Sequence, residues 1–308
     1  MRLIFMGTPD FAAVALKKII SEEHTVLCVF TQPDKPKGRS GKPVPSPVKL
    51  VAEEAGIQVY QPEKLRDEEN ATLIRELDPE IIVVAAYGQI LPESILSIPK
   101  LGCVNIHASL LPKYRGAAPI ERSILDGEEK TGITTMYMAK GLDTGDILEQ
   151  AETDILPTDT GESRTDKLAE LGAELIISTM DKLQQGTVTP VPQDDSAATY
   201  AAKLDKEMGL LDFSLPAQEL ERTIRALTPW PGTFTYLDGK KLKILSADVT
   251  EASGEPGEFT EITKKSLTVA CGCDGLKIKT LQPEGKKPMD TAAFLNGNHL
   301  TAGMRLGE

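Results

Sequence analysis

The first 110 residues alternate short apolar runs with segments of helical spacing. The runs LIFMG and EIIVVAA are continuous and apolar, whereas DFAAVALKKII and EKLRDEENATLIREL have apolar residues at helical intervals. Strands without polar alternation, separated by helices, are typical of a parallel sheet that is covered on both faces. We therefore predict an α/β domain with a Rossmann-like, mostly parallel sheet, in which ligands bind beyond the carboxyl ends of the strands.

The pattern changes near residue 205. The segment TFTYLDGKKLKILSADV has Asp-Gly at its centre, which is a strong hairpin signal, and SLTVACGCDGLKIKTL repeats the arrangement. Short strands separated by turns predict a small β-barrel. Residues 187–205 are rich in Pro, Asp, Ser and Ala and lack clear periodicity. These patterns predict an α/β domain over 1–186, a linker over 187–205 and a β-rich domain over 206–308.

Charge and hydropathy limit the classes of function. The formal net charge is −12, with 31 acidic and 21 basic residues in 1–204 but 15 acidic and 13 basic residues in 205–308. Nucleic-acid binding would therefore have to use local basic surfaces. No run of 18 apolar residues occurs, and the short apolar run at the N-terminus predicts a first strand rather than a secretory signal. We expect a cytoplasmic monomer without a membrane partner.

The segment CVNIHASLLPKYRGAAPI contains the strongest candidate for a catalytic site. His107 is one of three histidines in the chain, and Asn105 precedes it by two residues on a predicted strand. Side chains two apart on a strand point to the same face, about 6.6 Å apart. An amide that can stabilise an oxyanion, beside an imidazole that can move a proton, suits acyl transfer. A structural hydrogen-bonding role for His107 stays open on the residues alone.

Metal and nicotinamide cofactors are not expected. The chain has no H-x-x-x-H or H-E-x-x-H spacing, and the pair Cys271 and Cys273 lacks a second pair at zinc spacing. We expect the four cysteines to be reduced thiols. The turn MGTPDF follows a predicted strand but contains no G-x-G-x-x-G, so NAD binding is not predicted.

Several longer motifs extend over most of the chain. They are FMGTPDFA at 5–12, FTQPDKPKGRSGK at 30–42, PSPVK at 45–49, VAAYGQILP at 84–92, NIHASLLPKYRGAAPI at 105–120, GLDTGDIL at 141–148 and ALTPWPGTF at 226–234. In this order they resemble the 10-formyltetrahydrofolate-dependent formyltransferases, and among them the members that formylate initiator methionyl-tRNA. The resemblance implies an N-terminal catalytic domain and a C-terminal OB-like barrel, a type that often binds nucleic acid. One departure is that Arg164 and Thr165 are more polar than is usual in the family.

The resemblance also implies roles for individual residues. It makes Asn105 and His107 catalytic and places the catalytic carboxylate at Asp143, which the residues alone would leave as an Asx-turn residue. The implied folate-binding residues are Ser109, Leu110, Leu111, Pro112, Gln89, Ile90 and Leu91, the last three through backbone groups. The implied tRNA-binding residues are Lys37, Arg39, Lys42, Lys203 and Lys206.

The implied reaction transfers a formyl group from the co-substrate 10-formyltetrahydrofolate to the α-amino group of methionyl-tRNA, for translation initiation. Two alternatives stay open. The same fold could formylate a small amine or hydrolyse 10-formyltetrahydrofolate, and a non-catalytic protein could keep the fold and bind tRNA. The basic loop 31–42 and the β-rich C-terminal domain argue against the first alternative. The presence of Asn105, His107 and Asp143 argues against the second.

Overall fold

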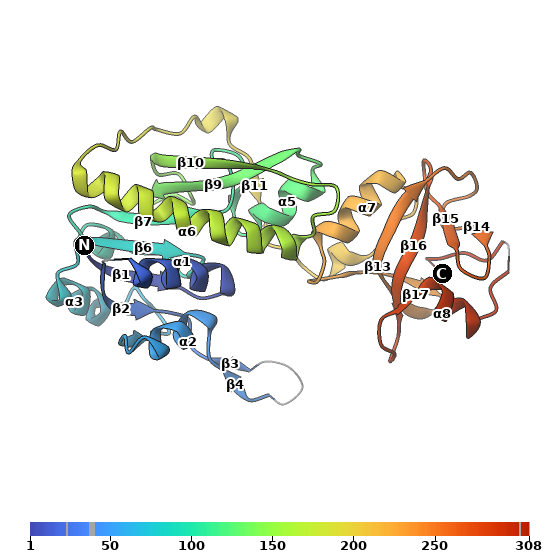
Figure 1. Cartoon of the computed structure of the whole chain (residues 1–308), viewed down its shortest axis with the longest axis horizontal. Helices are drawn as coiled ribbons and strands as arrows, with labels where there is room; N and C mark the ends of the chain where they lie inside the picture. The colour runs from blue at the N-terminus through green and yellow to red at the C-terminus, as the bar shows by residue number, and fades with distance from the viewer. Residues whose placement is uncertain (23, 37–40, 302, 308) are drawn as a thin grey trace. The chain divides into compact units, whose positions relative to one another are not determined.

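The protein is described from a computed structural model, which covers residues 1–22, 24–36, 41–301 and 303–307 (Figure 1). Its contacts divide the chain into two compact units. The first unit comprises Met1–Pro119, Lys130–Asp154 and Thr165–Ala201, and the second comprises Ile120–Glu129, Ile155–Arg164 and Ala202–Glu308. This division assigns much of the segment 187–205 to the first unit. The domain limits derived from the sequence stay a prediction.

The first unit is built on a seven-stranded sheet. From one edge to the other its strands are β10 (Ile147–Asp154), β9 (Lys130–Tyr137), β7 (Cys103–His107), β6 (Ile81–Ala85), β1 (Arg2–Gly7), β2 (Thr25–Phe30) and β5 (Val59–Tyr60). The pairings from β7 to β5 are parallel, whereas β7 with β9 and β9 with β10 are antiparallel. The predicted mostly parallel sheet is confirmed.

Helices accompany this sheet, as the alternation of patterns predicted. They are α1 (Asp10–Ser21), α2 (Pro47–Glu54), α3 (Glu68–Leu77), α4 (Glu93–Leu96) and α6 (Gly161–Gln185). The start of α2 is fixed by Ser46, whose hydroxyl accepts a hydrogen bond from the Lys49 N–H at 3.1 Å. The helix expected from residue 63 begins only at Glu68, because Asp67 before it has an extended backbone with φ −67° and ψ 135°. The Leu65 N–H, upstream of the helix, is bonded to the Gln89 side chain at 2.8 Å.

The two faces of the sheet pack against different helices. Ile82, Val84 and Cys103 share a core with Ile74 of α3. On the other face, Gly172 of α6 lies so close to Ile106 that an added Cβ would be 3.0 Å from its side chain. Since side chains alternate along a strand, Asn105 and His107 lie on the same face as Cys103, opposite α6.

The second unit contains an antiparallel sheet. Its strands are β12 (Thr233–Leu237), β13 (Lys240–Thr250), β16 (Gly275–Pro283), β15 (Leu267–Ala270) and β14 (Phe259–Ile262), with β17 (Met289–Asp290) paired to β16. Asp238 and Gly239 connect β12 to β13 with φ angles of 49° and 71°, as in a tight hairpin. Helices α7 (Ala217–Ala226) and α8 (Thr291–Asn296) contribute to its core. The predicted fold class, α/β with an additional C-terminal β-rich domain, is confirmed.

Four very short strands and one further helix complete the structure. They are β3 (Lys35–Pro36), β4 (Pro43–Val44), β8 (Arg115–Gly116), α5 (Pro119–Leu125) and β11 (Tyr200–Ala201), in which β3 pairs with β4 and β8 with β11. Within the described ranges, no helix has the length and apolar character that crossing a membrane requires.

Arg164, the departure noted from the family pattern, is buried inside the second unit. Its side chain is 1% exposed and its Nη1 lies 3.1 Å from Oδ2 of Asp159, which is 3% exposed. The polar residue is therefore accommodated by an internal ion pair at the start of α6.

Candidate active site

The end of β7 and the loop before β10 bring His107 and Asp143 together. His107 is 5% exposed, and its Nδ1 lies 3.8 Å from Oδ2 of Asp143. The Nε2 atom lies 2.9 Å from the carbonyl oxygen of Tyr114 and must donate to it, because a carbonyl can only accept. Nδ1 is therefore the ring nitrogen that can take up or release a proton. The pairing of His107 with a carboxylate was expected only from the family resemblance.

The position of Asp143 depends on contacts with distant residues. Its φ angle is 51°, in the left-handed region that non-glycine residues rarely adopt. Its Oδ2 accepts a hydrogen bond of 2.8 Å from the backbone N–H of Gly116, which lies 27 positions earlier. At Gly145 a Cβ would be 1.8 Å from the carbonyl oxygen of Tyr137, so only glycine fits there. The carboxylate thus does more than close a local turn.

Asn105 lies on the same strand and the same face as His107. Its neighbours across the sheet are Val84 on β6 and Met136 on β9, and its side chain is half-buried. An amide donor, an imidazole and a carboxylate therefore come from the end of β7 and one adjacent loop. Such a set can stabilise an oxyanion and transfer a proton.

The segment 109–112, which directly follows β7, is fixed to β9 and β10. Thr134 donates to the carbonyl oxygen of Ser109 at 2.7 Å and accepts from the N–H of Leu111 at 3.1 Å. Gln150 donates to the carbonyl oxygen of Leu111 at 2.9 Å. Ser109 and Leu111 are buried, and Leu110 and Pro112 are half-buried. This backbone is held firmly by two side chains that the sequence pattern did not single out.

The segment 89–91, for which the resemblance implies folate binding through backbone groups, follows β6. The Gln89 side chain accepts from the N–H of Leu65 at 2.8 Å and donates to the carbonyl oxygen of Pro62 at 3.0 Å. Leu91 is buried, whereas Ile90 is 87% exposed. Because β6 and β7 are parallel neighbours, the segments that follow them both leave the same edge of the sheet.

Two family models together cover most of the chain. One is described as formyl transferase and matches residues 1–180, and the other as formyl transferase, C-terminal domain, and matches residues 203–299. The chain belongs to the formyl transferase family. The family expected from the sequence motifs is thereby confirmed, and the residues Asn105, His107 and Asp143 lie within the first match.

Full-length relatives of this formyl transferase are close. A protein of Lachnospira eligens named methionyl-tRNA formyltransferase is 51% identical over 100% of this chain and 100% of its own length. A protein of Geobacter metallireducens with the same name is 50% identical over 100% of this chain and 99% of its own length.

Solved structures of this fold are more distant in sequence. A sugar 3N-formyl transferase, WlaRD, solved in the presence of dTDP and 5-N-formyl-THF, has a TM-score of 0.68 and 18% identity over 93% of this chain and 99% of that chain. Methionyl-tRNA formyltransferase from Clostridium thermocellum has a TM-score of 0.56 and 19% identity over 81% of this chain and 94% of that chain. HypX from Aquifex aeolicus, solved with tetrahydrofolic acid, has a TM-score of 0.62 and 15% identity over 96% of this chain and 47% of that chain. These likenesses support the fold.

The basic residues predicted to contact tRNA lie in different parts of this formyl transferase. Lys42 is exposed in the first unit, and Lys203 and Lys206 are exposed in the second. Lys37 and Arg39 lie outside the described residues.

Asp34, at the start of the basic loop 31–42, is held by two side chains. Its carboxylate lies 2.8 Å from Lys49 Nζ and accepts from Gln61 Nε2 at 2.7 Å. The Lys49 ammonium, and then the Gln61 amide, lower the pKa of Asp34. Strands β3 and β4 pair directly after this contact.

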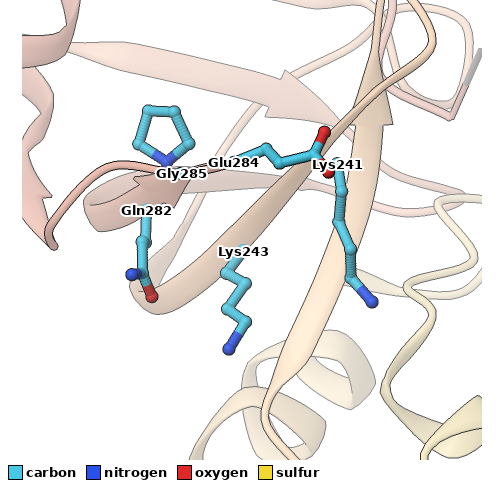
Figure 2. Close-up of a pocket in the computed structure, with 6 residues that line it drawn as sticks. Lys241, Lys243, Gln282, Glu284 and Gly285 are labelled. Carbon is cyan, nitrogen blue, oxygen red and sulfur yellow. The ribbon is translucent and has the colours of Figure 1, made fainter. Parts of the chain in front are cut away.

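A surface hollow lies in the second unit (Figure 2). It is lined by Lys241, Lys243, Gln282, Pro283, Glu284 and Gly285. Lys241 Nζ lies 3.4 Å from the centre of the Phe234 ring, a cation–π contact. The hollow contains none of the residues predicted for catalysis. The candidate active site is therefore the one around His107 and Asp143.

Among the described residues, side chains that can bind metals are not clustered, and the cysteines do not form disulfides. In the described part of the chain, no three or more His, Cys, Asp or Glu side chains are grouped so that they could hold a metal ion. The four cysteines are free thiols, as predicted. Burial raises the pKa of the Cys28 and Cys103 thiols to about 12.

Proposed function

We propose that the protein transfers the formyl group of 10-formyltetrahydrofolate to the α-amino group of initiator methionyl-tRNA. The observation that carries this proposal is the identity of about half of all residues, over the full length, to proteins named methionyl-tRNA formyltransferase. The same full-length identity favours this acceptor over a small amine or water. The geometry around His107 suits the chemistry that such a transfer needs.

The reaction begins when the free amine of the methionyl ester attacks the formyl carbon. A peptide α-amine has a pKa of about 7.7 to 8.0, and the adjacent ester lowers it, so the neutral amine is accessible near neutral pH. The new N–C bond turns the formyl oxygen into an oxyanion. The Asn105 amide and a protonated His107 donate hydrogen bonds to it, and one such donor contributes about 3 to 4 kcal/mol.

His107 acts through Nδ1 in this scheme, since Nε2 is bonded to Tyr114. The 3.8 Å separation from Asp143 exceeds a hydrogen-bond length, so an Nδ1–H can be directed at substrate while the carboxylate stabilises the positive charge. When the C–N10 bond breaks, protonated His107 gives its Nδ1 proton to N10, and Nδ1 then takes up the proton that the attacking amine loses. The products are N-formylmethionyl-tRNA and tetrahydrofolate, with no covalent enzyme intermediate.

The co-substrate is assigned to the segments that follow β6 and β7. Residues 109–112 offer a fixed backbone beside His107, and residues 89–91 offer backbone groups near the pterin, because the Gln89 side chain is already bonded to residues 62 and 65. Backbone recognition of a heterocycle requires such fixed segments.

The tRNA is assigned to the basic residues Lys37, Arg39, Lys42, Lys203 and Lys206. Each phosphate contact that is removed should reduce the slope of log affinity against log salt by about one. Arg39→Ala should weaken the productive use of charged tRNA and leave the KM for the folate unchanged. We further assign the enzyme to the cytoplasm, as a monomer that acts in translation initiation.

The test is formyl transfer from 10-formyltetrahydrofolate to methionyl-tRNA, with wild type and His107→Ala measured side by side. We expect transfer by wild type and a loss in kcat of about 10²- to 10⁴-fold in the variant. His299→Ala is a matched control, because it removes an exposed histidine of the second unit. If wild type instead released formate or formylated only a small amine, the tRNA acceptor would be wrong.

A further inference from the structure

We propose that Gln193, together with Arg115, is a positioning group that holds Asp143 against His107. This inference rests on the proposed function, since it assigns a task to the same catalytic pair. Gln193 lies in the segment 187–205, which the sequence pattern predicted to be a linker. In the structure the side chain of Gln193 is half-buried, whereas Val191 and Pro192 before it and Asp194 and Asp195 after it are exposed.

The amide nitrogen of Gln193 holds the loop that contains Asp143. Nε2 donates to the carbonyl oxygen of Asp143 at 2.9 Å and to that of Gly145 at 2.7 Å. The segment itself is fixed nearby, because Val191 and Ile147 exchange two backbone hydrogen bonds of 2.8 Å. Both N–H hydrogens of the Gln193 amide are thus bonded to carbonyl oxygens of the loop that contains Asp143.

The amide oxygen of Gln193 holds the other side of the site through Arg115. Oε1 accepts from Arg115 Nε at 3.0 Å and from Nη2 at 2.8 Å. Arg115 is 2% exposed, and its Nη2 also contacts the exposed Asp195 at 2.8 Å. The guanidinium is therefore oriented mainly by a neutral amide inside the unit.

Arg115 stands between the two backbone groups that touch the catalytic pair. The carbonyl oxygen of Tyr114 accepts from His107 Nε2, and the N–H of Gly116 donates to Asp143 Oδ2. Gln193 thus joins both sides of the pair: its oxygen fixes the segment 114–116, and its nitrogen fixes the loop 143–145.

The catalytic loop needs such support because of its backbone. A non-glycine residue in the left-handed region costs about 1 kcal/mol or more and persists only where the surroundings impose it. Asp143 is in this region, and the two bonds from Gln193 flank it. Loss of these bonds allows Asp143 to relax and lengthens its 3.8 Å contact with His107.

Gln193→Glu removes the N–H donors of the amide and keeps an oxygen that can accept from Arg115. The new carboxylate therefore faces the carbonyl oxygens of Asp143 and Gly145 without a donor for either. We expect kcat to fall about 10²-fold, as for a catalytic group displaced by about 1 Å, with both KM values within about threefold of wild type. Gln58→Glu is the matched control with the same change of charge, at an exposed residue whose side-chain amide donates to its neighbour Val59; it should leave kcat unchanged. An unchanged kcat in folded Gln193→Glu would overturn the proposal.

A double-mutant cycle with Asp143→Asn separates positioning from general structural support. If Gln193 acts through Asp143, adding Gln193→Glu to Asp143→Asn should cost less than about twofold in kcat, whereas a purely structural effect would multiply the two losses and overturn the proposal. The His107 ring signals in ¹H–¹³C NMR, assigned with His107→Ala among three histidines, should shift in Gln193→Glu without substrate. Unshifted signals would also contradict it.

Two controls keep the outcomes distinct. If Gln193→Glu does not fold, Gln193→Ala removes the same bonds without a charge and is measured in the same cycle. If His107→Ala and Asp143→Asn retain activity, the proposed function fails first. If those two variants are inactive and both folded Gln193 variants are active, only the positioning role fails.

Discussion

Two pairs of opposite charge, one in each unit, are built in different ways. In the first unit His107 and Asp143 are 3.8 Å apart, with side chains that are 6% and 16% exposed. In the second unit Arg164 and Asp159 are 3.1 Å apart, with side chains that are 1% and 3% exposed. The His107–Asp143 distance is longer, and its two side chains are more exposed. The two side chains carry opposite charges only when His107 is protonated.

The difference fits the role that we propose for each pair. Asp159 also accepts hydrogen bonds from the Leu156 N–H at 2.9 Å and from the Ser163 hydroxyl at 3.2 Å, so its carboxylate is committed to the turn before α6. Asp143 lies 3.8 Å from His107 Nδ1, too far for a tight hydrogen bond, which suits the proton exchange with substrate that we propose. The pair that holds a turn is short and buried, whereas the pair proposed to transfer protons is longer and more exposed.

The largest effect is expected when the His107–Asp143 pair is changed. Asp143→Asn keeps the shape of the side chain and removes the charge that stabilises protonated His107. We expect kcat to fall about 10³-fold, while the midpoint of thermal unfolding changes by only a few degrees. Steady-state kinetics and calorimetry on the same preparation measure both. A large fall in the midpoint of thermal unfolding would mean that the His107–Asp143 pair also stabilises the fold.

Changing the Arg164–Asp159 pair should instead lower the stability of the fold and leave kcat nearly unchanged. Arg164→Met removes the buried cation that lies 3.1 Å from the Asp159 carboxylate, which costs about 3 to 5 kcal/mol of unfolding free energy. Urea unfolding measures this loss, and kcat of the remaining folded protein should be within about twofold of wild type. Adding Asp159→Asn should recover part of the stability, since the buried charge is then removed. No recovery would contradict the ion-pair explanation.

A smaller effect is expected from Thr134→Val, beside the His107–Asp143 pair. Valine has a similar shape but neither donates to the Ser109 carbonyl nor accepts from the Leu111 N–H, a loss of about 1 to 3 kcal/mol. The KM for 10-formyltetrahydrofolate should rise about tenfold. Thr268→Val, at a buried threonine of the second unit, is the control and should leave this KM unchanged. Equal KM values in the two variants would argue against folate binding at 109–112.

The smallest effect is expected at the Asp34–Lys49 pair, which is more exposed than the other two, at 28% and 18%. Asp34→Asn should cost less than about 1 kcal/mol at pH 7. Because the pKa of Asp34 is lowered in the folded protein, its contribution is present above the unfolded value near 3.8 and is lost as pH falls below it. Urea titrations at pH 7 and pH 3 should therefore show a difference between wild type and variant that shrinks at pH 3.

Several features of the fold were predictable from short segments. The continuous apolar runs predicted β1 and β6, and the Asp-Gly turn predicted the hairpin of β12 and β13, because both depend on local periodicity and turn chemistry. The start of α3 was placed too early, since helical spacing of apolar residues cannot reveal that Asp67 takes an extended backbone at the N-cap position of the helix. The assignments of Asn105, His107 and Asp143 as catalytic stay predictions.

The sequence by itself determined the strand and helix pattern, the family, and the placement of Asn105 and His107 on one face of one strand. These follow from residues that are adjacent or a few positions apart. The tertiary structure brings Asp143 to His107, a meeting that the sequence implied only through the family resemblance. It alone decided that Gln193 contacts Arg115 across 78 positions of sequence. Such contacts depend on strand order and on loops without periodicity, and a polar residue in such a loop carries no local sign of the partner it will meet.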